Sequence, residues 1–167
     1  RGAEISFQNG NGDLEVTEWE SDFIQIETLI YGDSSVGVPE DLEIHFENLD
    51  EDLSILVDYP EGIFGCSVDF AVRIPFDSDY TLLNRTQNGD TFIDADVLVE
   101  VFATNGDMQI TALSSRGLES TNGDIEVVLS DQKGSLDIFT SNGDISVSLG
   151  VLNDSLKIQT SNGDIYA

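Results

Sequence analysis

Apolar and polar residues alternate along the second half of the chain in a pattern that restarts at a fixed triplet. Asn-Gly-Asp begins at Asn88, Asn105, Asn122, Asn142 and Asn162, in steps of 17, 17, 20 and 20 residues, and once upstream at Asn11. Around Asn122, the apolar residues Leu118, Ile125, Val127 and Leu129 alternate with polar ones, and the other copies follow the same template. Period-two alternation on both sides of a turn predicts strand, turn, strand in each repeat.

A repeat of this length, holding two or three short strands, is typical of one coil of a parallel β-solenoid. Equivalent residues then stack about 4.8 Å apart, corner Asn side chains pass hydrogen bonds from coil to coil, and Gly supplies the positive φ of the corner. The predicted ladder comprises Asn105, Asn122, Asn142 and Asn162 with Gly106, Gly123, Gly143 and Gly163. A row of antiparallel hairpins is the competing interpretation, because Asn-Gly also favours hairpin turns. Hairpins, however, would not need identical residues at successive corners.

The first half of the chain fits the template once, from Ile5 to Val16, which predicts an additional coil that pairs with the repeats. Four further strands are predicted over Phe23–Leu29, Leu42–Phe46, Leu53–Tyr59 and Cys66–Ile74, with linkers at Gly32–Pro39 and Pro60–Gly65. Their close spacing indicates an antiparallel meander, and no helical periodicity of useful length occurs. We expect one all-β domain over residues 1–167, with the N-terminal strands in 1–80 and the repeat coils in 81–167.

Three segments together carry a family resemblance: "GDLEVTEW" at Gly12–Trp19, "VRIP" at Val72–Pro75, and "TSNGDI" at Thr140–Ile145 and Thr160–Ile165. This order resembles the prokaryotic putative-adhesin family of β-strand-repeat (NGDI-repeat) domains of uncharacterised function, over nearly the whole chain. The resemblance implies a right-handed β-solenoid in an exported or surface-anchored protein, and it implies no catalytic residues.

The net charge of the chain argues against several classes of binding partner. Asp and Glu number 33 against 6 Lys and Arg, which gives a formal net charge of −27. Such a chain cannot neutralise phosphates, which argues against nucleic-acid binding, and it is repelled by an anionic membrane surface. No apolar run approaches the ~20 residues of a membrane span. Self-repulsion of this size predicts a protein that works in high salt or with divalent cations.

Sites for catalysis are not evident. The single histidine, His45, is predicted to point outward between Glu43 and Glu47, as an ordinary surface residue of an acidic patch. No Gly-x-Ser-x-Gly motif marks a hydrolase, and no carboxylate pair stands out among so many acids. We therefore expect a protein without enzymatic activity and without an organic cofactor.

The corner aspartates are the candidate cation ligands. Asp107, Asp124, Asp144 and Asp164, with Asp90 at the start, should form one outward column. Neighbouring charges about 4.8 Å apart repel by roughly 1 kcal/mol in water and by more near a protein surface. Either bound Ca²⁺, which prefers oxygen ligands, or hydrogen bonds from amide groups of the corners would offset this repulsion.

Three other residues are candidates for modification. Cys66, the only cysteine, shares a strand side with Val68 and Phe70, which favours a buried small residue; the alternative is a disulfide between two chains. Asn84 and Asn153 begin glycosylation sequons, of which Asn153 lies in a loop and Asn84 can point inward.

The ends of the chain lead to the functional expectation. The chain starts at Arg1 rather than Met, so a removed signal peptide or an artificial boundary is expected upstream. The final coil, ending at Ala167, carries no polar cap, and an uncapped edge is a template for another chain. We expect a cell-surface or extracellular structural subunit that self-assembles head to tail into a filament, sheath or surface layer. The alternative is a monomeric, adhesin-like binding module of the cell envelope.

Overall fold

The computed structural model describes residues 2–32, 37–60 and 65–167. The central parts of both predicted N-terminal linkers fall outside these described residues. The strands run, in chain order, over Glu4–Asn11 (β1), Leu14–Trp19 (β2), Gln25–Tyr31 (β3), Glu43–Leu49 (β4), Asp52–Asp58 (β5), Ser67–Pro75 (β6), Thr81–Asn88 (β7), Thr91–Asn105 (β8), Met108–Asn122 (β9), Ile125–Leu129 (β10), Leu136–Asn142 (β11), Ile145–Leu149 (β12), Leu156–Asn162 (β13) and Ile165–Tyr166 (β14). Within the described residues, no helix has the length and apolar character needed to cross a bilayer.

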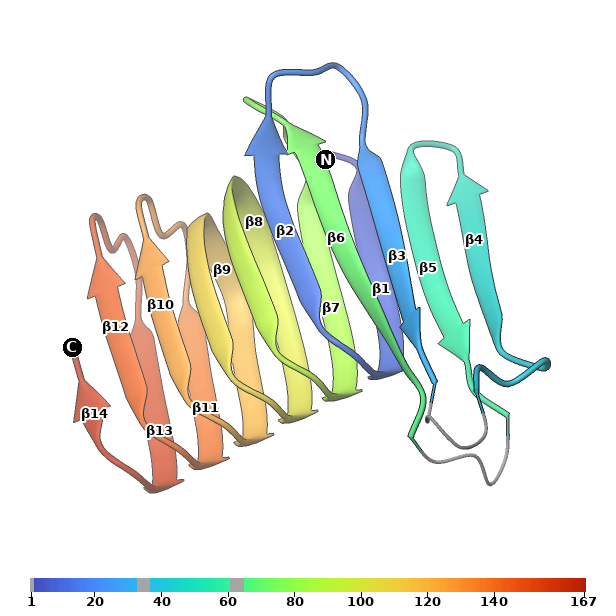
Figure 1. Cartoon of the computed structure of the whole chain (residues 1–167). Coiled ribbons are helices and arrows are strands. Elements are labelled where there is room, and N and C mark those ends of the chain that lie inside the picture. The colour runs from blue at the N-terminus through green and yellow to red at the C-terminus, as the bar shows by residue number, and fades with distance from the viewer. Residues whose placement is uncertain (1, 33–36, 61–64) are drawn as a thin grey trace.

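The strands form two layers that lie face to face (Figure 1). The front layer runs in the order β3, β6, β2, start of β8, start of β9, β10, β12, β14. The back layer runs in the order β4, β5, β1, β7, end of β8, end of β9, β11, β13. Each Asn-Gly-Asp corner carries the chain from the back layer to the front layer.

The coils stack as the repeat predicts. Ile125 lies beside Ile145 and Met108 in parallel strands, and Asn122 lies beside Asn142 and Asn105. This register excludes antiparallel hairpins for the repeats, because a hairpin would pair the two strands on either side of one corner. The upstream coil also joins the stack, since β1 pairs with β7 and β2 pairs with β8, both in parallel.

The sheet as a whole is mixed, and the predicted four-stranded meander does not form. β4 pairs antiparallel with β5, and β3 pairs antiparallel with β6, but β3 and β4 belong to different layers. The reason is that β1 and β2 each leave one edge without a neighbour. β5 covers the edge of β1 and β6 covers the edge of β2, so the N-terminal strands are divided between the layers.

The two repeat lengths have a structural cause. In the 17-residue coils, β8 and β9 pass from the front layer to the back layer as continuous strands, with register shifts near Ala95 and Val99. In the 20-residue coils, the segments 130–135 and 150–155 form a loop at this second corner. The fully buried Gln132 organises the first of these loops. Its Oε1 accepts the backbone N–H of Ser115 at 2.9 Å, and its Nε2 donates to the Ser115 carbonyl at 2.9 Å.

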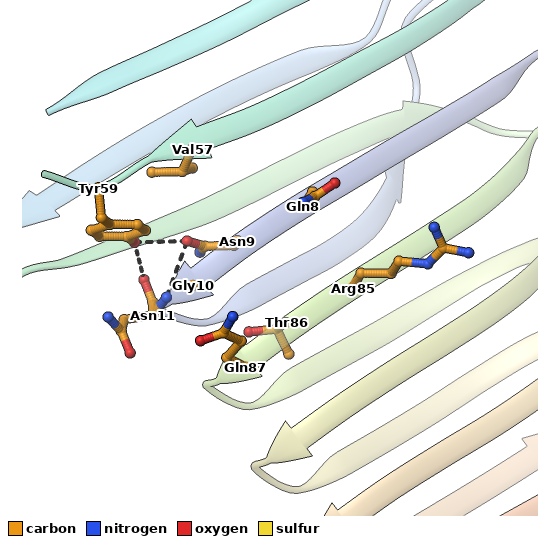
Figure 2. Close-up of a pocket in the computed structure, with 9 residues that line it drawn as sticks. All are labelled: Gln8, Asn9, Gly10, Asn11, Val57, Tyr59, Arg85, Thr86 and Gln87. Atoms are coloured by element: carbon orange, nitrogen blue, oxygen red, sulfur yellow. Dashed lines mark hydrogen bonds between the residues drawn. The ribbon is translucent and has the colours of Figure 1, made fainter. Parts of the chain in front are cut away.

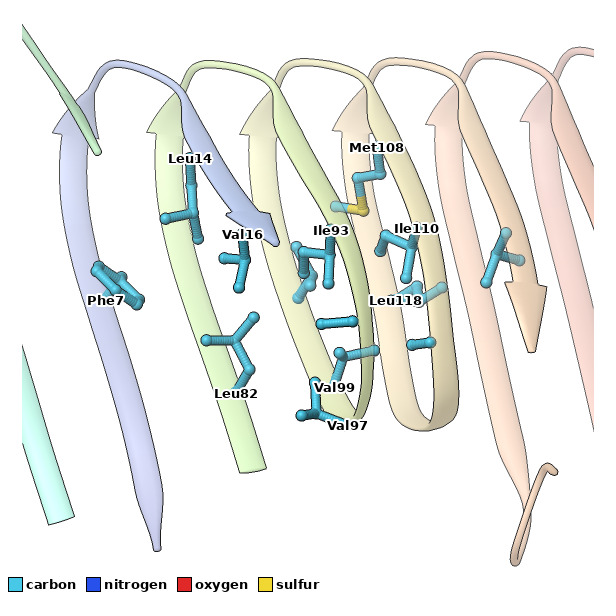
Figure 3. Close-up of a cluster of buried hydrophobic side chains, with 14 of the residues drawn as sticks. Phe7, Leu14, Val16, Leu82, Ile93, Val97, Val99, Met108, Ile110 and Leu118 are labelled. Atoms are coloured by element: carbon cyan, nitrogen blue, oxygen red, sulfur yellow. The ribbon is translucent and has the colours of Figure 1, made fainter. Parts of the chain in front are cut away.

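The core lies between the layers and runs the length of the stack (Figure 3). Alternate residues of each strand point inward, so Val16, Ile93 and Ile110 form one apolar row of the front layer. Leu82, Val99 and Leu118 contribute to the core from the back layer. Burial of such rows, at about 25 cal/mol per Å² of apolar surface, stabilises a fold in which each coil contacts only its neighbours. The outward surfaces of both layers remain available for binding.

Candidate functional site

The corner asparagines form a continuous hydrogen-bonded ladder. Each Nδ2 donates to Oδ1 of the Asn in the preceding coil, at distances of 2.7 to 2.9 Å. The ladder comprises Asn11, Asn88, Asn105, Asn122, Asn142 and Asn162. Side-chain amides satisfy one another along the stack in this way, so the Asn column fixes the register of the coils.

The corner glycines are required by close backbone approach. Gly123 has a φ of 154°, and a Cβ there would lie 2.0 Å from the carbonyl oxygen of Gly106. A Cβ added to Gly106 would lie at the same distance from the Gly89 carbonyl oxygen, and one added to Gly163 at the same distance from that of Gly143. No side chain fits at these corners, so glycine lets successive coils approach within backbone hydrogen-bonding distance.

The corner aspartates form an exposed column whose carboxylates are tied to the backbone. The N–H of each Asp donates to Oδ1 of the Asp in the preceding coil, at distances of 2.8 to 2.9 Å. This acidic column comprises Asp13, Asp90, Asp107, Asp124, Asp144 and Asp164. Hydrogen bonds to the ionised form offset part of the repulsion between neighbouring charges. Among the described residues, no group of three or more His, Cys, Asp or Glu side chains is placed to hold a metal ion.

A shallow groove runs beside the acidic column on the front layer. It is lined by Asp90, Phe92, Asp107, Gln109, Asp124 and Glu126, among others. The carboxylates outnumber every other polar group in this set, so the groove suits a cationic partner and repels an anionic one.

The second concave feature was not predicted from the sequence. It is a polar cleft of about 460 Å³ at the junction of the upstream coil with the repeats, here called the N-terminal pocket (Figure 2). Its lining comprises Gln8, Asn9, Gly10, Asn11, Val57, Tyr59, Arg85, Thr86 and Gln87. The pairing of β5 with β1 extends as far as Leu56 beside Gln8, and the lining residues of both strands beyond that pair border the cleft.

Tyr59 is the organising side chain of the N-terminal pocket. Its hydroxyl donates to Oδ1 of Asn9 at 2.7 Å and also approaches the carbonyl oxygen of Asn11. The ring lies against Gly10, where a Cβ would come within 3.1 Å of it. Burial raises the pKa of Tyr59 to about 12, so the hydroxyl stays protonated and keeps both contacts through the physiological pH range.

Two residues that line the N-terminal pocket have buried polar side chains, and only one of the two side chains has hydrogen-bond partners. Asn9 donates Nδ2 to the carbonyl of Val68 at 2.7 Å and is fully engaged. Thr86 is 8% exposed, and its hydroxyl has no hydrogen-bond partner. At the equivalent position of later coils, Thr140 and Thr160 donate to the carbonyls of Gly123 and Gly143. The Thr86 hydroxyl is therefore an unsatisfied polar atom buried behind the pocket wall, and such a group costs free energy.

One sequence signal marks this pocket. The upstream corner reads Asn9-Gly10-Asn11-Gly12-Asp13, with a doubled Asn-Gly that no other corner has. The doubling places Asn9 where all later coils but one carry Thr or Ser, and Asn9 lies beside Thr86 in the register. Tyr59 carries no comparable signal, because its position depends on how β5 joins β1.

The remaining candidate residues lie apart from both concave features. His45 is on the outer surface of β4, with Nε2 3.3 Å from Oε2 of Glu43. Cys66 is a free thiol that is 5% exposed, and burial raises its pKa. This places it among the core residues, as the first interpretation expects, and a disulfide to a second chain would require this region to open.

The two sequons differ in accessibility. Asn84 is 2% exposed and donates Nδ2 to Oγ1 of Thr91 at 2.8 Å, so it cannot accept a glycan in the folded chain. Its inward direction follows from the alternation in β7. Asn153 is exposed in the loop before β13 and stays a candidate.

Comparisons with known proteins identify similar solved structures and a family model that matches the chain. The chain is similar in fold to a solved structure described as a putative cell adhesion protein from Clostridium sporogenes ATCC 15579, with a TM-score of 0.57 and 11% identity over 99% of this chain and 91% of that chain. A structure described as a putative adhesin from Bacteroides fragilis NCTC 9343 gives a TM-score of 0.37 and 15% identity over the same shares. A comparison with curated protein sequences found no match. The Toastrack DUF4097 family matches residues 64–167, more than half of the sequence, and the chain belongs to this family.

Proposed function

We propose that the chain is a non-enzymatic, adhesin-like binding module of the cell surface, and that the N-terminal pocket is its binding site. The observation that carries this proposal is the pocket itself. It combines amide side chains and a tyrosine held by hydrogen bonds on a scaffold of parallel strands. Concave sites with a few convergent polar groups are the usual location of ligand binding. The similar fold described as a putative cell adhesion protein supports a role at the cell surface.

The pocket can bind without doing chemistry. Gln8, Gln87 and Arg85 are exposed at its rim, where they can donate and accept hydrogen bonds with hydroxyl or amide groups of a ligand. Their strands are held in register by the Asn ladder on one side and by β5 on the other. Rigid positioning of this kind reduces the entropic cost of binding.

A surface-binding assay tests the proposal. Fluorescently labelled protein is incubated with intact bacterial cells and with purified cell-wall material. We expect saturable binding that the double variant Gln8→Ala/Gln87→Ala weakens, while the matched control Gln109→Ala/Thr111→Ala, on the outer surface of the front layer, binds as the native chain does. Absence of saturable binding to any surface would show that the module is not an adhesin. Equal binding by both variants would remove the pocket from the site.

Head-to-tail assembly is a second candidate function, and the coil at the end of the given sequence has apolar surface that another coil would cover. Ile165 and Tyr166 are 46% and 56% exposed, and Leu156 and Ile158, which continue the core rows, are half-buried. Within the described part of the chain, no group donates to Oδ1 of Asn162 or of Asp164. A further coil stacked on β13 and β14, from a continuing chain or from a second copy, would cover these apolar residues and extend both ladders.

Negative-stain microscopy and sedimentation at high protein and salt concentration separate the two candidates. Filaments or sheets that Ile165→Asp abolishes would support assembly. A monodisperse monomer under all these conditions would leave the binding module as the function.

A further inference from the structure

A row of outward side chains crosses six of the parallel strands of the back layer, one from each strand, and beyond its first member the same register continues through Leu56 of β5 and His45 of β4. This outer row comprises Gln8 (β1), Arg85 (β7), Phe102 (β8), Glu119 (β9), Phe139 (β11) and Gln159 (β13). Because the strands are parallel and in register, the six side chains lie along one line parallel to the axis of the stack. The outer row begins at the rim of the N-terminal pocket, to which Gln8 and Arg85 also belong.

The side chains of the outer row point away from the core. On either side of Phe102, Val101 and Ala103 are buried, and Phe139 lies between the buried Ile138 and Thr140. The two rings are themselves half-buried, so each presents part of its surface to solvent. One strand, with Glu119, separates them, which places the rings about 10 Å apart.

The outer row is locally neutral in a strongly acidic protein. It contains one cation and one anion, Arg85 and Glu119, in a chain with a net charge of −27. The guanidinium of Arg85 lies over one face of the Phe102 ring, 5.5 Å from its centroid, and the cation–π contact holds it there. A ligand therefore has only the rest of the Phe102 ring to pack on. A polyanionic ligand would be repelled by the surrounding charge, and a cationic one would find the acidic column of the front layer more favourable. The outer row thus suits an uncharged ligand.

We propose that the outer row binds an uncharged, extended, β-1,4-linked polysaccharide that runs along the axis of the stack. The C–H face of a pyranose ring is apolar and packs on aromatic rings, while its hydroxyl groups need polar partners at the edge. In an extended β-1,4-linked chain, successive sugars are turned over, so every second ring presents the same face. The length of two such sugar units is close to the separation of the two phenylalanines. Gln8, Arg85, Glu119 and Gln159 supply the polar partners between and beyond the rings.

A protein partner fits the outer row less well. Two half-buried rings separated by a carboxylate give no contiguous apolar patch of the size that marks protein docking surfaces. The glycan interpretation rests on the proposed binding function and adds to it the class of ligand and the surface along which that ligand extends.

Calorimetric titration with cellohexaose and with the hexamer of β-1,4-linked N-acetylglucosamine tests the proposal, with α-linked maltohexaose as the control ligand. We expect at least one β-linked hexasaccharide to bind and the α-linked one not to bind. Phe102→Leu and Phe139→Leu keep apolar volume but remove the ring, so each should weaken binding about tenfold. Phe92→Leu is the matched control, because Phe92 is 37% exposed on the outer surface of the front layer. It should leave the affinity unchanged, and thermal melts confirm that all three variants are folded.

Three results would overturn the glycan proposal: no binding of either β-linked hexasaccharide at millimolar concentration, equal loss in Phe92→Leu and Phe102→Leu, or a dimer in sedimentation that Phe102→Leu dissociates. Its failure is distinguishable from failure of the proposed function. A chain that still binds cells through Gln8 and Gln87 without recognising these sugars is an adhesin with another ligand, whereas a chain that binds neither is not an adhesin.

Discussion

The carboxylate of Asp69 accepts the backbone N–H of Asp13 at 3.0 Å, although 56 residues separate them in the sequence. Asp69 thereby adds a member to the acidic column before the first Asn-Gly-Asp corner. The carboxylates that follow repeat this contact, each accepting the N–H of the next. Each inner member of the column therefore has two opposed roles, as a hydrogen-bond acceptor that stabilises the stack and as a charge that repels its neighbours.

Substitutions at Asp124 separate these two roles. Asp124 accepts the N–H of Asp144 at 2.8 Å. Asp124→Asn keeps an oxygen in this place and removes the charge, so at low salt the variant should be more stable than the native chain. Asp124→Ala removes the acceptor as well and should be less stable than Asp124→Asn by about 1 kcal/mol. Denaturant unfolding of the three proteins measures both differences.

The salt dependence of stability further separates the charge repulsion at Asp124 from its hydrogen bond. Screening weakens the repulsion between exposed charges, so the advantage of Asp124→Asn over the native chain should vanish in molar NaCl, while the gap between the two variants persists. An advantage that is independent of salt would mean that charge repulsion along the column is not its origin.

Gly123 should tolerate no side chain. A Cβ at this corner would lie 2.0 Å from the Gly106 carbonyl oxygen, and both atoms belong to backbones held by the ladder. Gly123→Ala should lower the free energy of unfolding by about 3 kcal/mol. Gly117→Ala is the matched control. Gly117 lies in β9, where the nearest atom to an added Cβ is the Asp137 carbonyl oxygen at 3.8 Å, so stability should stay the same or rise by up to about 1 kcal/mol. Similar losses in both variants would contradict the close-approach argument.

The stacked coils were predictable because each repeat contains the corner triplet and the alternating apolar residues that define one coil. Ile125 and Ile145 hold the same place relative to their corners, and a parallel stack is the arrangement that brings such identical places together. The alternation also placed His45 outward and allowed Asn84 to point inward. These inferences needed only local periodicity and a repeated corner.

The N-terminal half was less predictable because its pairings are not local. Whether β3 pairs with β4 or with β6 depends on which edges β1 and β2 leave open, and the alternation within β3 does not specify its partner strand. Asp69 joins the column without an Asn-Gly-Asp triplet, and Tyr59 reaches Asn9 only because β5 adds to β1. The pocket therefore forms only where β5 joins the coil of β1. The sequence predicts each of these strands separately but not their pairing.

Tyr59 should make stability fall at high pH. Burial raises the pKa of its hydroxyl in the folded chain to about 12, from 10.0 in an exposed tyrosine. The folded state therefore holds this proton more tightly than the unfolded state. The contribution to stability is complete below pH 10 and is lost as the pH rises from 10 toward 12. Because Tyr59 is only partly buried, the loss should be on the order of 1 kcal/mol.

The variant Tyr59→Phe isolates this contribution. Near neutral pH it should be less stable than the native chain by about 1 kcal/mol, because the contacts to Asn9 and Asn11 are lost. Since the other titrating groups are common to both proteins, the gap between them should narrow as the pH rises above 10. Denaturant titrations at several pH values measure it, and a gap that stays constant across this range would show that the hydroxyl is not held in its protonated form.

Added salt should raise the melting temperature of the native chain. Comparison of Na⁺ with Ca²⁺ distinguishes diffuse charge screening from calcium binding to the acidic column. The chain carries a net charge of −27, and Oδ1 of the column carboxylates from Asp13 to Asp144 already accepts a backbone N–H. Diffuse screening of this charge predicts equal stabilisation by NaCl and CaCl₂ at matched ionic strength, after treatment with EDTA. The sequence-based hypothesis of a calcium-binding column predicts instead an additional rise with Ca²⁺. Asp124→Asn discriminates between the two, because removal of one carboxylate should reduce a calcium-specific rise and leave the diffuse effect nearly unchanged. We expect the diffuse effect, and a calcium-specific rise that Asp124→Asn reduces would establish the column as a cation site.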